Sequence, residues 1–172
     1  MDYQLGYILG FAVVLGILIS ILAYKGINQD NKAKPKYDER QKAVRGKSFT
    51  YGFYASAIAS FLFMLMHLFG LGNFWGPYGY FTIIIIGIIV QMTHAIFHDA
   101  YLGLNTNARK YIIFMSIISV INIAAAVSGI VSGEMFKDGV LNDSFLNLLC
   151  SILFAVLVAD LSIKRFIDKK EK

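Results

Sequence analysis

The residues best suited to chemistry lie on one face of a predicted helix in the middle of the chain. Gln91, His94 and His98 follow one another at spacings of three and four residues, so their side chains share one side of an α-helix. Polar groups at membrane depth usually face the interior of a bundle, find a partner or line a water-filled path. The pattern predicts either interhelical hydrogen bonds, with His98 at the membrane surface, or a site that binds a ligand or conducts protons.

Asp160 is the ionisable residue of a later apolar stretch, at a predicted depth similar to that of His94. An imidazole and a carboxylate that meet there could form a proton relay. The other predicted partner of Asp160 is Lys164, at the i,i+4 spacing of a local ion pair. Zinc takes three or four protein ligands, more than His94, His98 and one carboxylate supply. We therefore expect no metal, no cofactor and no catalytic residues, and an enzyme is the least favoured function.

Five long apolar stretches must position these side chains. They cover residues of about 5–24, 48–71, 78–98, 111–132 and 144–163. Each can cross a hydrocarbon core of roughly 30 Å at about 1.5 Å of rise per helical residue. Hydrophobic residues make up 57% of the chain and charged residues only 16%, against about a quarter charged in soluble domains. We therefore expect an all-α integral membrane bundle of five transmembrane helices, with the lipid bilayer as its partner.

The distribution of Lys and Arg predicts the orientation of this bundle. Of the 16 basic residues, eight lie in the predicted loop 25–47, two at 109–110 and five at 164–172. Loops rich in Lys and Arg resist translocation, so we expect the amino terminus outside and the carboxyl terminus in the cytoplasm. This arrangement accounts for the net charge of +5, so a nucleic-acid partner is not expected.

The predicted cytoplasmic loop 25–47 contains a segment of mixed charge, Asp38-Glu39-Arg40-Gln41. After Pro35 this segment can form a short helix, with Asp38 and Lys42 as an i,i+4 pair and Gly46 as a stop or hinge before the second span. The segment is either a solvated anchor that fixes topology or a docking site for a cytoplasmic protein partner.

Small residues recur at helical spacing and suggest close helix packing in lipid. They are Gly6 and Gly10 in the first span, Gly52, Ser56 and Ser60 in the second, and Ala125, Gly129 and Gly133 in the fourth. Such stripes serve either packing within one bundle or contact between copies in a homo-oligomer.

The segment Tyr37-Asp38-Glu39-Arg40-Gln41 before the second span, with His98-Asp99-Ala100-Tyr101 after the third, resembles uncharacterised small multi-pass membrane proteins of bacteria. In those proteins an Asp-Glu-Arg-Gln-like segment precedes a spanning helix, and some are encoded beside small helix-turn-helix regulators. The resemblance implies a bacterial cytoplasmic membrane and a regulatory protein partner, and it implies no catalytic residues.

Two functions follow from these patterns. The first is a non-enzymatic integral membrane protein, a regulatory or sensory accessory that acts through its cytoplasmic loop while the face of Gln91 and His94 senses a ligand or a proton. The alternative is a small oligomeric transporter or channel subunit, with Gln91, His94, His98 and Asp160 along its path.

Overall fold

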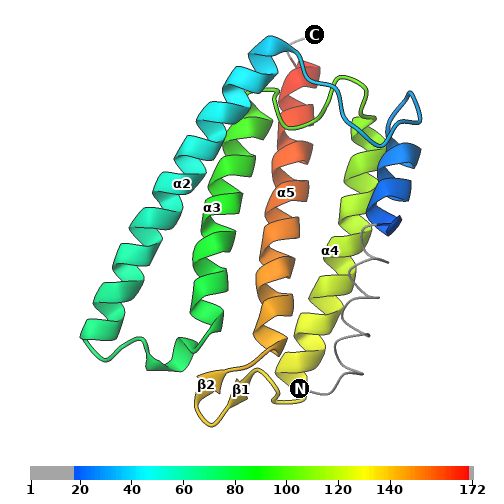
Figure 1. The fold of residues 1–172 in the computed structure, drawn as a ribbon. Helices are drawn as coiled ribbons and strands as arrows, with labels where there is room; N and C mark the ends of the chain where they lie inside the picture. The colour runs from blue at the N-terminus through cyan, green and yellow to red at the C-terminus, as the bar shows by residue number, and fades with distance from the viewer. Residues whose placement is uncertain (1–17, 171–172) are drawn as a thin grey trace.

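The computed structural model describes residues 18–170 as an arrangement of helices with one small hairpin (Figure 1). The elements are a helix at Leu18–Ile27, α2 at Glu39–Leu68, the 3-10 turn η1 at Asn73–Trp75, α3 at Tyr78–Phe97, α4 at Ala108–Val131, β1 at Phe136–Lys137, β2 at Val140–Leu141 and α5 at Ser144–Lys170. Within these residues four helices, α2 to α5, are long and apolar enough to cross a membrane. They correspond to the second to fifth predicted spans, whereas most of the predicted first span lies outside the described residues.

The start of α2 differs from the sequence-based expectation. The helix begins at Glu39, not near Ser48, because Asp38 caps it: the Asp38 side chain accepts a hydrogen bond from Gln41 N at 2.6 Å. The helix continues through Gly46, so of the stop or hinge predicted at this glycine the stop is wrong. Lys42 forms its ion pair with Glu39, at 2.7 Å, and not with Asp38. The predicted loop 25–47 therefore ends at residue 38.

The predicted break between the second and third spans is confirmed. Gly70 and Gly76 have φ angles of 73° and 51°, values that favour glycine, and Pro77 immediately precedes α3. Trp75 packs in this turn against Phe63 of α2 and Phe145 of α5, with ring centroids 5.3 Å and 5.9 Å away. The turn thus ties three helices together at one end of the bundle.

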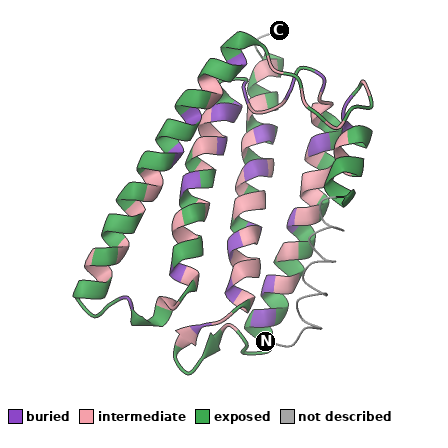
Figure 2. Ribbon diagram, viewed as in Figure 1, coloured by how far each residue is buried: buried purple, intermediate pink, exposed green. Residues whose placement is uncertain are grey.

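The long helices lie side by side in the order α2, α3, α5, α4, which is not their order in the chain (Figure 1). Buried apolar side chains cluster at two levels, one formed by Ile27, Met92, Ile96, Tyr111, Leu157 and Leu161 and the other by Leu141, Phe145 and Leu149. Exposed positions follow each long helix along its length (Figure 2). Many carry large apolar side chains, such as Val131 at 82% exposure. A surface of this kind suits contact with lipid.

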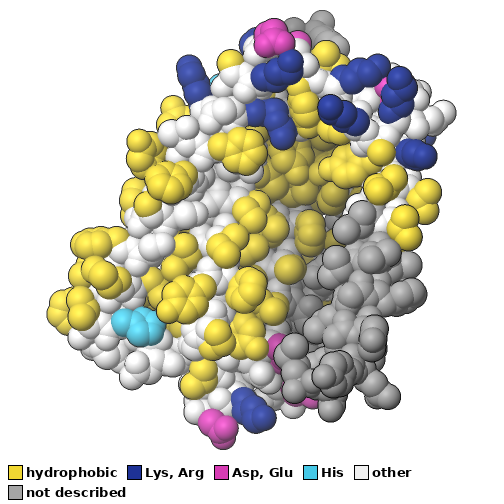
Figure 3. All heavy atoms as spheres, in the orientation of Figure 1, with side chains coloured by type: hydrophobic (Ala, Val, Ile, Leu, Met, Phe, Trp, Pro, Cys, Tyr) yellow, Lys and Arg dark blue, Asp and Glu magenta, His cyan; other side chains and the backbone are white. Residues whose placement is uncertain are grey.

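Lys and Arg side chains gather at one end of the molecule, while hydrophobic side chains cover its length (Figure 3). We call this the basic end. There the segment 25–47, the turn 98–110 and the end of α5 meet: Lys110 Nζ donates to Gly26 O at 3.1 Å, and Lys164 forms an ion pair with Asp99 at 3.1 Å.

Gly52 of α2 and Gly129 of α4 serve packing within the protein, whereas Ser60 is exposed and Gly133 has nothing within 4 Å. A Cβ atom on Gly52 would lie 2.7 Å from Gly87 O of α3, and one on Gly129 would lie 2.9 Å from Ser144 Cβ of α5. Helix backbones approach closely at these points, as small residues allow in membranes. Gly6 and Gly10 lie outside the described residues.

Candidate functional site at the basic end

His94 points from α3 toward α2, where it meets a buried serine. Its Nδ1 lies 2.8 Å from Ser48 Oγ, and the same hydroxyl donates to Val44 O at 2.9 Å. The bond joins the two side chains, and the tautomer of His94 decides which of them donates. The side chain of Ser48 is fully buried, so this bond satisfies a polar group between two helices. For His94, the sequence predicted either an interhelical hydrogen bond or a site for a ligand or proton, and this contact is an interhelical hydrogen bond.

The two histidines of α3 stack on each other. Their ring centroids are 4.1 Å apart with an interplanar angle of 19°, and His98 Nδ1 donates to His94 O at 2.8 Å. His98 is exposed and lies at the carboxyl end of α3, as its predicted place at the membrane surface requires.

Asp160 has neither of its predicted partners. Its Oδ2 accepts a hydrogen bond of 2.6 Å from Thr93 Oγ1, while Lys164 pairs with Asp99 and Asp168 at 3.1 Å and 2.8 Å. Thr93 faces α5 and the adjacent residue, His94, faces α2, since neighbouring positions project about 100° apart around a helix. The predicted pairs of Asp160 with His94 and with Lys164 are therefore both wrong.

Gln91 lies in a pocket at the basic end that sequence analysis did not predict. The pocket, of about 220 Å³, is lined by Tyr24, Pro35, Tyr37, Arg45, Phe49, Gln91, Tyr101, Leu102, Gly103, Thr106 and Tyr111. We call it the tyrosine pocket. Its four tyrosines come from the helix Leu18–Ile27, the segment before α2, the turn after α3 and the start of α4, so only the folded chain assembles them.

The polar groups of the tyrosine pocket are rich in hydrogen-bond donors. Tyr37 OH donates to Tyr101 O at 3.3 Å, and the hydroxyls of Tyr101 and Tyr111 lie 3.0 Å apart. The Arg45 guanidinium lies 4.2 Å from the centre of the Tyr37 ring and donates to Tyr101 O at 3.4 Å. Burial raises the pKa of the Tyr37 and Tyr101 phenols, so both stay protonated at neutral pH. Among the described residues, the Gln91 amide and the remaining N–H groups of Arg45 form no hydrogen bond, so they suit a ligand that offers oxygen acceptors.

The Asp38-Glu39-Arg40-Gln41 segment joins α2 to the turn that follows α3. Gln41 is 5% exposed, and its Nε2 donates to Asp99 O at 2.8 Å and to Leu102 O at 3.2 Å. Arg40 Nη1 donates to His98 O at 3.3 Å. Asp38 and Gln41, predicted to dock a partner, thus serve the cap of α2 and a contact within the chain. Glu39 and Arg40 remain exposed.

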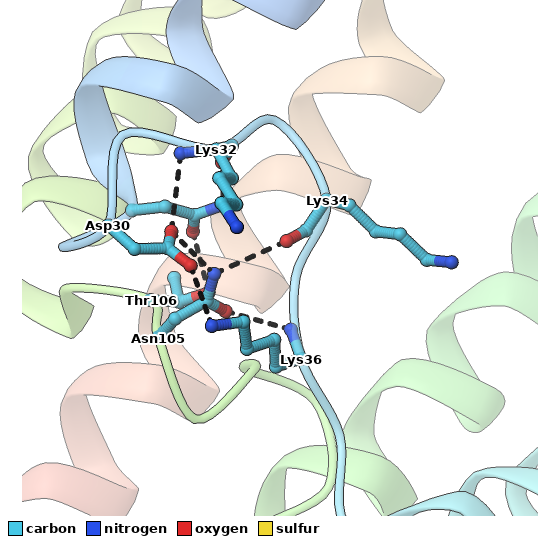
Figure 4. A network of polar contacts seen from close by, with 7 residues as sticks. Asp30, Lys32, Lys34, Lys36, Asn105 and Thr106 are labelled. Carbon is cyan, nitrogen blue, oxygen red and sulfur yellow. Dashed lines mark hydrogen bonds and ion pairs between the residues drawn. The ribbon is translucent and has the colours of Figure 1, made fainter.

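A second junction of the same two segments is centred on Asn105, which is 8% exposed (Figure 4). Its Nδ2 donates to Asp30 Oδ1 at 2.9 Å and to Lys34 O at 3.2 Å, and its Oδ1 accepts from Lys36 N at 2.8 Å. Lys36 Nζ also pairs with Asp30 at 3.0 Å. The hydrogen bond from Asn105, followed by that from Lys36, lowers the pKa of the half-buried Asp30 from 3.8 to about 2.

Sequence analysis missed Ser48 and Asn105, and only Ser48 lies in a sequence pattern that could have predicted its contact. Ser48 extends the stripe of Gly52, Ser56 and Ser60 by one more step of four, so the spacing could have placed it toward α3. Asn105 has no periodic signal, because its partners lie about 70 positions away in an irregular segment.

Comparison of the chain with protein-family models, with curated proteins and with solved structures found no match.

Proposed function

We propose that the chain is a five-span protein of a bacterial cytoplasmic membrane, with its amino terminus outside and its basic end in the cytoplasm. The four membrane-length helices and their apolar surface support insertion in lipid. The gathering of Lys and Arg at the basic end supports the orientation, because basic loops stay on the cytoplasmic side (Figure 3). The resemblance in the Asp38–Gln41 segment supports the bacterial origin.

The proposed function is that of a non-enzymatic sensory accessory whose ligand-binding element is the tyrosine pocket. One observation carries it: the pocket is lined by Tyr37 and Tyr101, which belong to the two segments that Gln41 and Asn105 hold together. A ligand between these tyrosines contacts both segments at once. The ligand therefore favours the conformation in which the two segments are joined. The size of this effect depends on how much more tightly the ligand binds that conformation than one in which the segments are apart.

The pocket also limits the chemistry of its ligand. A volume of about 220 Å³ is below the usual range of about 300–1,000 Å³ for drug-sized ligands, so the ligand is small. The Gln91 amide and the N–H groups of Arg45 that form no hydrogen bond with the described residues favour a carboxylate or carbonyl group on an apolar ring or short chain. Occupancy is communicated to the start of α2, where Glu39 and Arg40 are exposed to a cytoplasmic protein partner.

The same geometry gives less support to an oligomeric transporter or channel subunit. Asp160 and His94 were to share one path, but Asp160 of α5 bonds to Thr93 of α3 while His94 of α3 points to Ser48 of α2. Gly52 and Gly129 of the small-residue stripes contact neighbouring helices of the same chain.

The test is purification of the full chain in mild detergent, followed by mass spectrometry of the small molecules and proteins that accompany it. Gln91→Leu removes the pocket amide at nearly constant volume. Asn122→Leu is the matched control, since the Asn122 amide donates at 2.9 Å to Ile118 O of its own helix and lies outside the pocket. We expect an acceptor-bearing small molecule with wild type and Asn122→Leu and its depletion with Gln91→Leu. Equal recovery from all three proteins would refute the pocket as the ligand site.

The orientation is tested separately by cysteine labelling in a Cys150→Ser background. A cysteine at Asn73 or Asp138 should react with an impermeant reagent applied to intact cells, and one at Asn31 should not. The reverse pattern would overturn the proposed topology without bearing on the tyrosine pocket.

A further inference from the structure

A larger pocket of about 620 Å³ opens at the basic end between α4, α5 and the turn that joins α3 to α4. It shares one wall with the tyrosine pocket, the turn containing Tyr101 and Leu102, and is otherwise separate from it. Arg109 of α4 and Arg165 of α5 lie on its rim, and Ile112 and Leu161, deeper in the same helices, supply apolar lining. The pocket is therefore basic at its mouth and apolar toward the bundle.

Some charged side chains of this pocket have partners of opposite charge within the described residues, and others do not. Lys164 bonds to both acidic residues of the lining, Asp99 at 3.1 Å and Asp168 at 2.8 Å. Arg109 and Arg165 are exposed, and their side chains form no ion pair or hydrogen bond with any residue between 18 and 170. Two guanidinium groups thus face one pocket without a protein acceptor, while the carboxylates there are already paired.

We propose that this pocket binds the headgroup of an anionic phospholipid from the leaflet at the basic end. Guanidinium groups bind phosphate oxygens in a bidentate manner, and basic pockets between spanning helices on the cytoplasmic side suit anionic headgroups. The depth is appropriate, because next to Arg165 the surface of α5 already exposes Ile163 and Phe166, apolar side chains that suit acyl chains. The volume lies within the range that holds a small organic ligand.

The two arginines set the size of the expected effect. A basic residue near an anionic membrane surface contributes about 1 kcal/mol, which is a factor of about five in affinity. Loss of both should weaken binding roughly 30-fold, and the affinity should fall with ionic strength.

The experiment titrates the detergent-solubilised full chain with dioleoylphosphatidylglycerol or with zwitterionic dioleoylphosphatidylcholine, and measures bound lipid by native mass spectrometry. The test variant is Arg109→Gln/Arg165→Gln. The matched control is Lys25→Gln/Lys47→Gln, which removes two exposed charges from the same end but outside the pocket. Excess inorganic phosphate is added in a separate arm to distinguish a lipid headgroup from free phosphate.

We expect the wild type to prefer phosphatidylglycerol and to keep it in the presence of phosphate. The arginine variant should lose about 30-fold in affinity while the lysine variant stays near wild type. Equal binding of the two lipids, equal losses in the two variants, or displacement by phosphate would each overturn the proposal. If the glutamine pair does not fold, Arg109→Lys/Arg165→Lys replaces it. This pair keeps the charge but loses the planar fork, so unchanged affinity would contradict the bidentate contact.

Discussion

Replacement of Gln41 by glutamate tests whether a buried amide holds the start of α2 to the turn after α3. Glutamate keeps the length of the side chain and the oxygen that accepts from Asp38 N at 3.3 Å in the capping box. It removes the donor that serves Asp99 O at 2.8 Å and Leu102 O at 3.2 Å, and places an oxygen against both carbonyls. The substitution thus affects the contact between segments while it retains the local cap.

The magnitude follows from these two bonds. Each lost hydrogen bond costs about 0.5–1.5 kcal/mol, and a buried acceptor left without a donor costs about 1–3 kcal/mol. Because the turn lies at the basic end, its carbonyls can regain part of this loss by bonding to water. We expect Gln41→Glu to lower the free energy of unfolding by about 2–4 kcal/mol.

The assay is equilibrium unfolding of the full chain in mild detergent, combined with hydrogen exchange of the amides of residues 98–107. Glu39→Gln is the matched control in the same segment, because the Glu39 side chain is 91% exposed and pairs only with Lys42 among the described residues. It should change the free energy by less than about 0.5 kcal/mol. Comparable effects of the two substitutions, or protected amides in Gln41→Glu, would refute the inferred role of the buried amide.

Three further predictions concern the α2–α3 contact, the Asn105 junction and the α3–α5 contact. Gly87→Ala should destabilise the protein by about 1–3 kcal/mol, because its Cβ would lie 2.9 Å from the backbone of α2. Gly46→Ala, with nothing within 4 Å, should not destabilise it, and similar unfolding of the two would contradict the close contact. Asp30, whose pKa is lowered to about 2 from 3.8, should hold the junction fully above about pH 4 and lose it as the pH falls through 2, and Asp30→Asn should abolish this change in hydrogen exchange. Thr93→Val and Asp160→Asn should be coupled by about 0.5–3 kcal/mol in a double-mutant cycle of unfolding, whereas additive effects would exclude the bond.

Much of the architecture is predictable from local sequence. Apolar length gives the four described helices of membrane-spanning length, and the glycines and Pro77 between residues 70 and 79 mark the break between α2 and α3. The boundary at Glu39 was missed although its signal is local: Asp38 followed by Gln41 at the third position is a capping pattern. Hydropathy cannot detect that boundary, because the first turns of α2 are charged and lie before its apolar stretch.

The neighbours of each polar side chain were decided by tertiary structure. Helix rise gives the position of a residue along its helix, so the sequence predicts that Asp160 and His94 lie within long apolar helices. It does not state which helices adjoin or how each is rotated. The order α2, α3, α5, α4 places Thr93 toward Asp160 and His94 toward Ser48. A rotation of about 100° between adjacent residues is enough to exchange such partners.

What the sequence by itself determined is the set of membrane-length helices and the position of the basic residues relative to them, because both depend on residues close together in the chain. The junctions of Gln41 and Asn105, the tyrosine pocket and the arginine-rimmed pocket were decided only when the chain folded. The residues of each junction or pocket come from segments that are tens of residues apart in the chain. They meet through single hydrogen bonds or by lining the same pocket. No periodic pattern encodes such contacts, because each depends on the path of an irregular segment over the end of the bundle.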